Sequence, residues 1–202
     1  MTKNDYLNIL VEQIHSVVVA TVGSDGLPQT RVIDMMLQDS DGVYFLTAKG
    51  KAFYSQLEEQ KFVAISASKG KIAVSLRGKV KKIGKKNLDL IFEKNPYMKE
   101  IYPGETRAAL EVFQIYQAQG EYFDISVPSK IFRDFFQIGA EKILPAGYVI
   151  SSACTLCKKC AAVCPQNCID FSAAQATINQ NRCLHCGRCA EICPAHCVEK
   201  RS

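Results

Sequence analysis

Ten cysteines are the part of this 202-residue sequence best suited to chemistry. All ten lie between Cys154 and Cys197, and eight of them form two copies of the pattern C-x2-C-x2-C-x3-C-P. The copies start 29 positions apart and use Cys154, Cys157, Cys160 and Cys164, then Cys183, Cys186, Cys189 and Cys193. Thiolates at such short spacing indicate metal binding, because three of them on one tight loop can converge on a single centre.

A disulfide framework is the other common use of many cysteines. The sequence begins MTKNDYLNILVEQIHSVVVATV, where Asp5, Glu12 and His15 interrupt the apolar residues, so it does not have the pattern of a secretory signal. No stretch has the apolar length of a membrane span. We therefore expect a cytoplasmic protein, in which disulfides are rare and the cysteines bind metal.

Two kinds of metal site use C-x2-C pairs. Tetrahedral zinc accounts for four thiols, but not for a third cysteine at the same spacing and a fourth followed by proline, all of it twice. Clusters of the 4Fe–4S type use this arrangement. The pattern therefore favours 4Fe–4S clusters, with zinc as the alternative.

The two runs resemble those of the two-cluster bacterial ferredoxins. In that family the fourth cysteine, which we expect on the helix after the loop, ligates the other cluster. The resemblance implies that one cluster is held by Cys154, Cys157, Cys160 and Cys193. It implies that the second is held by Cys183, Cys186, Cys189 and Cys164.

Four further residues in or near these runs could reach a metal. Cys168 and Cys197 each follow a fourth cysteine by four residues, where ferredoxins usually have small apolar residues. We interpret both as buried thiols that pack like small hydrophobic residues, with an alternative ligand as the second interpretation. His185 and His196 are interpreted as exposed side chains or as donors to sulfur, and not as iron ligands.

The first 150 residues contain no cysteine, and the chain is 48% hydrophobic, enough for one sizeable core and a small module. Apolar periodicity predicts a helix over 3–14, a helix over 51–60 and short helical pieces between 86 and 110. Strands are predicted at 17–22, 29–37, 43–47, 61–68, 71–83, 110–117 and 121–126, the last two joined as a hairpin across Ala118–Gly120. Many antiparallel strands with few helices predict a barrel.

The cysteine-free part has neither a GxGxxG nor a Walker motif. Its segments ATVGSDGLPQTRVID, GVYFLTAKGKAFYSQL and GEYFD resemble, in this order, the pyridoxamine 5′-phosphate oxidase-like split barrels over approximately residues 10–127. The resemblance implies an antiparallel split β-barrel that binds FMN between the two subunits of a homodimer. Some relatives of this barrel bind haem or a deazaflavin, which are the alternatives.

By position, the resemblance assigns the FMN phosphate to Arg31, Thr47, Lys49 and Lys51, and places Val32 and Ile33 beside the isoalloxazine ring. Elementary physical chemistry supports a phosphate site here. The unpaired N–H groups of a helix N-terminus attract anions, and a guanidinium on a neighbouring strand adds forked contacts. Solvated surface charges are the alternative interpretation of these residues.

The stretch SKGKIAVSLRGKVKKIGKK (68–86) carries eight basic residues and no acidic one. We interpret it as a solvated strand edge that discourages aggregation, and a docking patch for an acidic redox partner is the second interpretation. A formal net charge of +5 is too small to indicate a nucleic-acid partner, and interleaved aromatic residues are missing. We expect neither nucleic-acid nor membrane binding.

Residues 128–150 include Phe132, Phe135, Phe136 and Ile138 and are too apolar for a free linker. We expect a packed segment between an FMN-binding domain at 1–127 and a two-cluster domain at 151–202. The fold class is mainly β plus α+β: an antiparallel split barrel followed by a small ferredoxin-like iron–sulfur domain.

These features predict an iron–sulfur flavoprotein that transfers electrons between two 4Fe–4S clusters and FMN and reduces a small molecule. The expected redox partner is a donor or acceptor protein, or a nicotinamide. The segment ISVPSK (125–130) lacks the basic residues with which the true oxidases hold pyridoxal phosphate, so the oxidase reaction itself is not expected. Because no residue stands out as a general acid or base, a non-catalytic electron carrier or redox sensor is the alternative.

Overall fold

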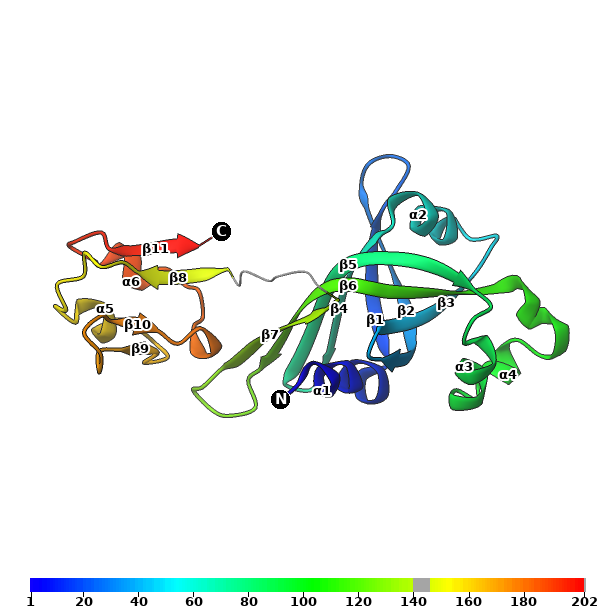
Figure 1. Ribbon diagram of the computed structural model, residues 1–202, viewed down its shortest axis with the longest axis horizontal. Coiled ribbons are helices and arrows are strands. Elements are labelled where there is room, and N and C mark those ends of the chain that lie inside the picture. Colours follow the sequence, from blue (N-terminus) through cyan, green and yellow to red (C-terminus); the bar gives the residue numbers. More distant parts are fainter. Residues whose placement is uncertain (140–145, 202) are drawn as a thin grey trace. The chain divides into compact units, whose positions relative to one another are not determined.

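The structure is a computed structural model that describes residues 1–139 and 146–201. Contacts divide the chain into two units (Figure 1). The described residues of the first unit are 1–122 and 136–139, and those of the second are 123–135 and 146–201. Each unit has its own cluster of buried hydrophobic residues.

The first unit is built around an antiparallel barrel. Within the described chain, six strands follow one another in the order β3-β2-β1-β4-β5-β6, pairing of β3 with β6 closes the ring, and β7 extends the sheet beyond β6. The strands are β1 (Ser16–Val22), β2 (Pro28–Asp39), β3 (Gly42–Ala48), β4 (Phe62–Lys69), β5 (Ile72–Gly84), β6 (Leu110–Asp124) and β7 (Phe132–Ile138). The barrel predicted from the sequence is confirmed.

Short helices fill the connections of the first unit. They are α1 (Lys3–Asn8), α2 (Ala52–Gln60), α3 (Leu88–Lys94), α4 (Met98–Ile101) and the 3₁₀ turn η2 (Gly104–Ala109). α1 runs directly into η1 (Ile9–Ile14), which is a π-helix, so the helix predicted over 3–14 changes type in its second half. In the described parts of the chain, no helix is long and apolar enough to cross a membrane.

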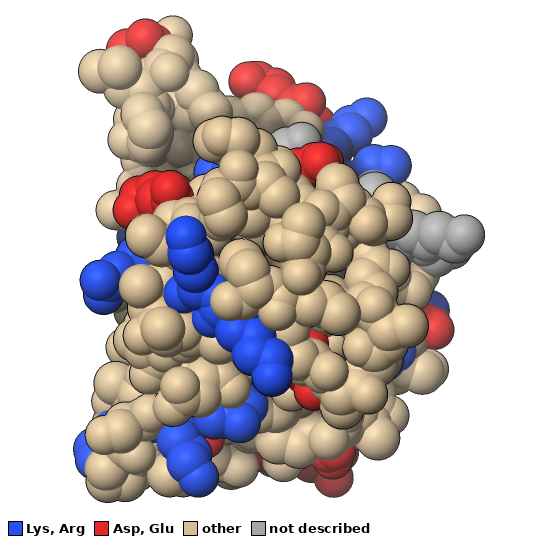
Figure 2. All heavy atoms as spheres, turned by 90° about the vertical axis from the view of Figure 1, so that its left-hand side faces the viewer, with Lys and Arg blue, Asp and Glu red and all other residues tan. Residues whose placement is uncertain are grey.

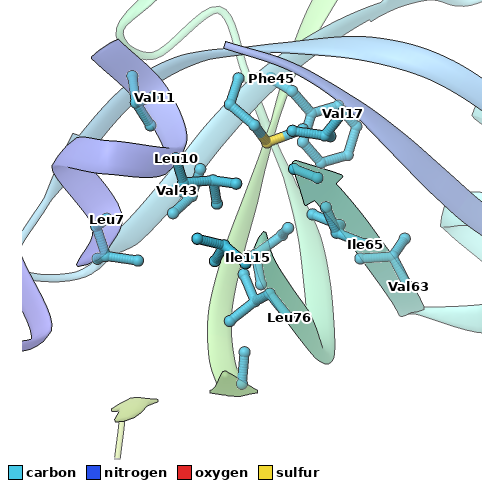
Figure 3. Packing of buried hydrophobic residues seen from close by; sticks show 14 of the residues in the cluster. Leu7, Leu10, Val11, Val17, Val43, Phe45, Val63, Ile65, Leu76 and Ile115 are labelled. Atoms are coloured by element: carbon cyan, nitrogen blue, oxygen red, sulfur yellow. The ribbon is translucent and has the colours of Figure 1, made fainter. Parts of the chain in front are cut away.

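Alternate residues of the strands form the barrel core (Figure 3). Every second residue is buried through most of β1 and β4, as expected when successive side chains point to opposite faces. Val17, Phe45 and Ile65 point into the core, and Leu7 and Leu10 from the N-terminal helices pack onto it. Burying a side chain of this kind contributes about 1.5–3 kcal/mol, so this cluster is the main source of stability.

β6 is one continuous strand of 15 residues, so the hairpin predicted across Ala118–Gly120 is wrong. The small residues that suggested a turn make room for packing instead. Ala118 is completely buried. A Cβ at Gly120 would lie 2.2 Å from the ring of Phe136, so the missing side chain lets this ring of β7 pack against β6.

The basic stretch lies mostly on β5, which is hydrogen-bonded between β4 and β6. The predicted edge position is therefore wrong, because both sides of this strand are paired. Some of its lysines also have specific partners. Lys82 donates a hydrogen bond to the Glu58 carboxylate, and the ammonium of Lys81 lies 4.6 Å from the centre of the Tyr116 ring.

The second unit consists of short elements around the cysteines. They are β8 (Gly147–Ile150), α5 (Lys159–Ala162), β9 (Ile169–Asp170), β10 (Thr177–Ile178), the 3₁₀ turn η3 (Gln180–Arg182), α6 (Arg188–Glu191) and β11 (Val198–Arg201). β8 pairs antiparallel with β11, and β9 pairs antiparallel with β10. Ile150, Ala176 and Val198 form its core together with Cys193 and Cys197.

The connection between β6 and β7 also belongs to the second unit. The side chain of Asn181 donates to the carbonyl of Arg133 at 2.7 Å, and the Arg133 guanidinium donates to the carbonyl of Cys183 at 2.8 Å. We expected a packed linker over 128–150, and part of this segment forms the strand β7. Residues 140–145 of that segment lie outside the described residues.

Replacing Gly78 with alanine should destabilise the barrel. A Cβ at this position would lie 2.1 Å from the Gln117 carbonyl oxygen and 2.4 Å from the Ala118 Cα, both in the backbone of β6. Overpacking costs typically about 1–3 kcal/mol, so the thermal unfolding midpoint should fall in calorimetry. Gly50→Ala is the control, because nothing lies within 4 Å of its Cβ position. Equal midpoints for the two variants would contradict this packing.

Candidate functional site

Arg31 of β2 lies among neutral polar groups. Its Nη1 donates to the hydroxyl of Thr21 at 2.5 Å, and its Nη2 donates to the side-chain oxygen of Gln56 at 3.1 Å. The guanidinium also lies over the ring of Phe53, 4.4 Å from its centre. Because Phe53 and Gln56 belong to α2, this helix fixes the position of the guanidinium.

The positive charge of Arg31 is not compensated. Among residues 1–139 and 146–201, no carboxylate forms an ion pair with it. Partial burial lowers the pKa of the guanidinium from its ordinary value, as expected for a cation that has lost water without gaining an anion. A phosphate would supply both the missing charge and acceptor oxygens for the forked N–H groups, so the site fits this group.

Lys51 and Lys49 lie close to the start of α2 and differ in their charge environment. Lys51 is exposed and immediately precedes the helix in an extended conformation, and no side chain caps the helix. The Tyr54 N–H already donates to the Lys51 carbonyl at 2.9 Å, so the N–H groups of Ala52 and Phe53 are the ones left for an anion. The ammonium of Lys49 pairs with the Glu111 carboxylate at 2.9 Å, so its charge is already partly neutralised.

Thr47, at the end of β3, is buried, and its hydroxyl has no hydrogen-bond partner within the described chain. An unsatisfied buried polar group costs about 1–3 kcal/mol. A polar ligand atom beside the strand end would recover this cost.

Val32 and Ile33 point to opposite faces of β2. Val32 is 67% exposed, whereas Ile33 packs against the barrel core. Val32 is therefore the more accessible of the two, and Ile33 is partly exposed. Arg31 lies on the same face as Ile33, because side chains two positions apart share a face.

The sequence reasoning missed several residues of this site. Gln56 is buried and donates through Nε2 to Oε1 of Gln29 at 2.8 Å, so the two amides and Thr21 form the surroundings of the guanidinium. Glu111 accepts hydrogen bonds from Lys49 and from the Tyr54 hydroxyl, and the bond from Lys49 lowers the pKa of its carboxyl. Single amides and one strand glutamate have no characteristic spacing, so no sequence signal could have identified them.

The two cysteine runs share one backbone conformation. Leu156 and His185, which are 29 positions apart, both have φ near 55°, an uncommon value for residues other than glycine. This turn lets the Leu156 N–H donate to Cys154 Sγ and the His185 N–H donate to Cys183 Sγ, both at 3.4 Å. Two further pairs at the same offset also have positive φ: Lys158 with Gly187, and Asn167 with His196.

A cavity lies between the first run and the end of the second. The thiols on its walls are Cys154, Cys157, Cys160, Cys193 and Cys197. Within the part of the chain that the structure describes, no three His, Cys, Asp or Glu side chains are gathered as a site for a single ion. Five thiols around one space suit a polynuclear cluster, in which several irons share the cysteines. Lys158 and Lys159 also border the cavity and would offset the charge of thiolates.

The thiols predicted for the other cluster are also brought close to one another. Cys189 interacts electrostatically with Cys183 and Cys186. Cys164 contacts Cys168, which in turn interacts electrostatically with Cys183. Each run therefore approaches the fourth cysteine of the other run.

The position of the helices differs from our expectation. α5 contains Cys160 and α6 contains Cys189, so each helix carries the third cysteine of its run and ends before the fourth. The reason is the length of the helices, which have four residues each. Cys164 and Cys193 lie just beyond them, immediately before a proline.

Comparison with known proteins identifies two families. Residues 5–122 match the family model described as pyridoxamine 5′-phosphate oxidase. Residues 147–194 match the model of the 4Fe–4S dicluster domain. No curated protein matches the chain.

Solved structures similar to the chain show the same fold at low identity. A NimC/NimA family protein from Clostridium acetobutylicum has a TM-score of 0.56 and 17% identity, covering 66% of this chain and 92% of that one. A protein related to general stress protein 26 from the same organism has a TM-score of 0.53 and 15% identity, covering 68% and 97%. General stress protein 26 from Bacillus anthracis has a TM-score of 0.50 and 14% identity, covering 68% and 100%.

Cys164→Ser should remove the cluster beside Cys183 and leave the cluster in the cavity beside Cys154. The reason is that Cys164 contacts Cys168, which interacts electrostatically with Cys183 of the second run. Iron content should fall by about half in anaerobically purified protein, and low-temperature EPR should show which signal is lost. Cys160→Ser is the matched control and should remove the other signal. Loss of the same signal in both variants would contradict the crossed arrangement.

Proposed function

Since the chain belongs to the pyridoxamine 5′-phosphate oxidase family and carries a 4Fe–4S dicluster domain, we propose that it is an iron–sulfur flavoprotein that transfers electrons between two 4Fe–4S clusters and FMN to reduce a small molecule. An oxidase-family barrel and a 4Fe–4S domain in one chain support a redox or electron-transfer role. When bound, FMN exchanges one or two electrons and each cluster exchanges one.

The observation that supports FMN most directly is the uncompensated guanidinium of Arg31. In this proposal Arg31 and Lys51 hold the phosphate, together with the open N–H groups at the start of α2. Gln56 keeps the guanidinium in position through its side-chain oxygen, and Phe53 supports its flat face. The side chains that we propose beside the ring are Ile33, on the same face of β2 as Arg31, and the exposed Val32. Lys49 has a weaker role, because Glu111 already neutralises it.

We assign the cluster ligands in the crossed arrangement. One cluster takes Cys154, Cys157, Cys160 and Cys193, and the other takes Cys183, Cys186, Cys189 and Cys164. The cavity shared by the first four thiols supports the first assignment. The contacts of Cys164 through Cys168 to Cys183 support the second.

The redox partner that we propose is a protein with an acidic surface. Figure 2 shows Lys and Arg side chains in a line near the middle of the view, with Asp and Glu side chains toward its margins. Lys158 and Lys159 are exposed and lie next to Cys157, which is also exposed. Complementary charge raises the rate of association between proteins, so cations around an exposed thiol favour docking of an anionic carrier.

We also propose a homodimer, in which the outer face of the sheet is the interface. Val18 is 43% exposed and pairs in register with Val32, and the neighbouring outward residues Ala64 and Ser66 are small and uncharged. An exposed face of this composition is typical of surfaces that bind another protein. Light scattering of the purified chain measures the oligomeric state.

Arg31→Ala should weaken FMN binding by at least 10-fold. Hydrogen bonds between charged groups are worth about 1.5–3 kcal/mol, and Arg31 forms no ion pair with a carboxylate of the described residues. Titration of FMN by flavin fluorescence measures the change, and riboflavin, which lacks the phosphate, should bind both proteins weakly. Lys71→Ala is the control for lost positive charge at an exposed position. Unchanged FMN affinity in the Arg31 variant would exclude this phosphate site.

An enzyme and a carrier differ in turnover. Anaerobic full-length protein with a reduced ferredoxin as donor should reduce many equivalents of an acceptor, with nitro compounds, quinones and free flavins as the acceptors to screen. A single oxidation per chain would indicate the carrier or sensor. Cys160→Ser, which removes a ligand of one cluster, should slow the turnover. Equal rates for this variant and the unmodified chain would show that the cluster does not supply the electrons.

A further inference from the structure

Each cysteine run is followed by a thiol that the metal motif does not use. Cys168 and Cys197 occupy equivalent positions, and they are 5% and 3% exposed. A packing role would need only an apolar side chain of similar size. The sulfur atoms of both residues have more specific surroundings.

Cys168 lies between two thiols of different runs. Its Sγ is 3.5 Å from Sγ of Cys164, and its thiol also interacts electrostatically with that of Cys183. In the proposed arrangement, Cys164 and Cys183 are ligands of the same cluster.

Cys197 repeats this arrangement at the other cluster. Its Sγ is 3.4 Å from Sγ of Cys193, and its thiol also interacts electrostatically with that of Cys154. Cys193 and Cys154 again come from different runs and are proposed ligands of one cluster. Each extra thiol therefore contacts the fourth cysteine of its own run and interacts electrostatically with the first cysteine of the other.

The direction of these hydrogen bonds follows from metal binding. A cysteine that ligates iron is a thiolate and can only accept a hydrogen bond. The shared proton must then belong to Cys168 or Cys197, whose S–H is a weak donor. Burial keeps water from replacing this donor.

We propose that Cys168 and Cys197 are positioning residues, which donate S–H hydrogen bonds to ligand sulfurs and raise the reduction potential of one cluster each. The proposal rests on the proposed clusters. A donor near a ligand sulfur stabilises the additional negative charge of the reduced state, and hydrogen bonds to sulfur are among the factors that set cluster potentials. Since each thiol touches ligands of one cluster, the two potentials are set separately.

Three substitutions at Cys197 separate the effect of the S–H donor from the effect of side-chain size. Cys197→Val keeps an apolar side chain of similar size without the donor, Cys197→Ser keeps a donor, and Cys197→Ala removes both. The same set at Cys168 is the matched control, because it concerns the other cluster. The measurements are iron content, an EPR-monitored redox titration and the S–H stretching band in the infrared, all on anaerobic full-length protein.

We expect full iron content in every variant at both positions. In the Val and Ala variants of Cys197, the midpoint potential of the cluster held by Cys154 should fall, and that of the other cluster should stay unchanged. The Ser variant should lie closer to the unmodified protein. The unmodified protein should show S–H bands, one of which is lost on each single substitution.

Other results would overturn the proposal. Unchanged potentials in iron-replete Val and Ala variants would leave packing as the only role. Loss of iron from one cluster in the Val variant would make the extra cysteine a ligand. Absence of S–H bands in the unmodified protein would exclude the donor even if a variant failed to fold. A purified chain without any iron–sulfur cluster would overturn the proposed function as well, so the two failures are distinguishable.

Discussion

The barrel depends on the hydrogen-bonding capacity of β6, which has three partner strands. A strand has two edges, and β5 occupies one of them. The other edge pairs with β3 from Leu110 to Ile115, and β7 lies beside it further along. Close approach at this strand requires positions without a side chain, and a Cβ at Gly42 would lie 1.9 Å from the Ile115 carbonyl oxygen. Closure of the barrel therefore sets strict limits on residue size.

α2 positions the polar groups beside the closed barrel. One turn of the helix contributes Phe53 and Gln56 to the guanidinium of Arg31, while Tyr54 hydrogen-bonds Glu111 on β6. This region therefore holds the Glu111 carboxylate, which is paired with Lys49, and the Arg31 guanidinium, which is not paired with a carboxylate of the described residues. An anion that entered this region would be attracted to the unpaired guanidinium.

The sequence was informative where chemistry requires a fixed spacing. The cysteine pattern needs three thiols on one loop, and its 29-residue offset reappears as positive φ at equivalent positions, for example Asn167 and His196. The strands β1, β4 and β5 were predictable because their buried residues alternate. Ala118 and Gly120 misled the prediction, because small residues indicate both turns and close packing, and only the neighbouring strand decides between them. Gln56 could not be predicted, since its role arises from its position beside Arg31.

The position of β7 in the sequence also bears on how the protein is made. Phe136 and Ile138 belong to the barrel core, yet they follow residues 123–135, which belong to the second unit. During synthesis the ribosome must therefore release the chain beyond residue 138 before the barrel can complete its core. The two units cannot be separated by one cut without taking core residues from one of them, and an expression fragment that ends near residue 122 would carry an open edge on β6.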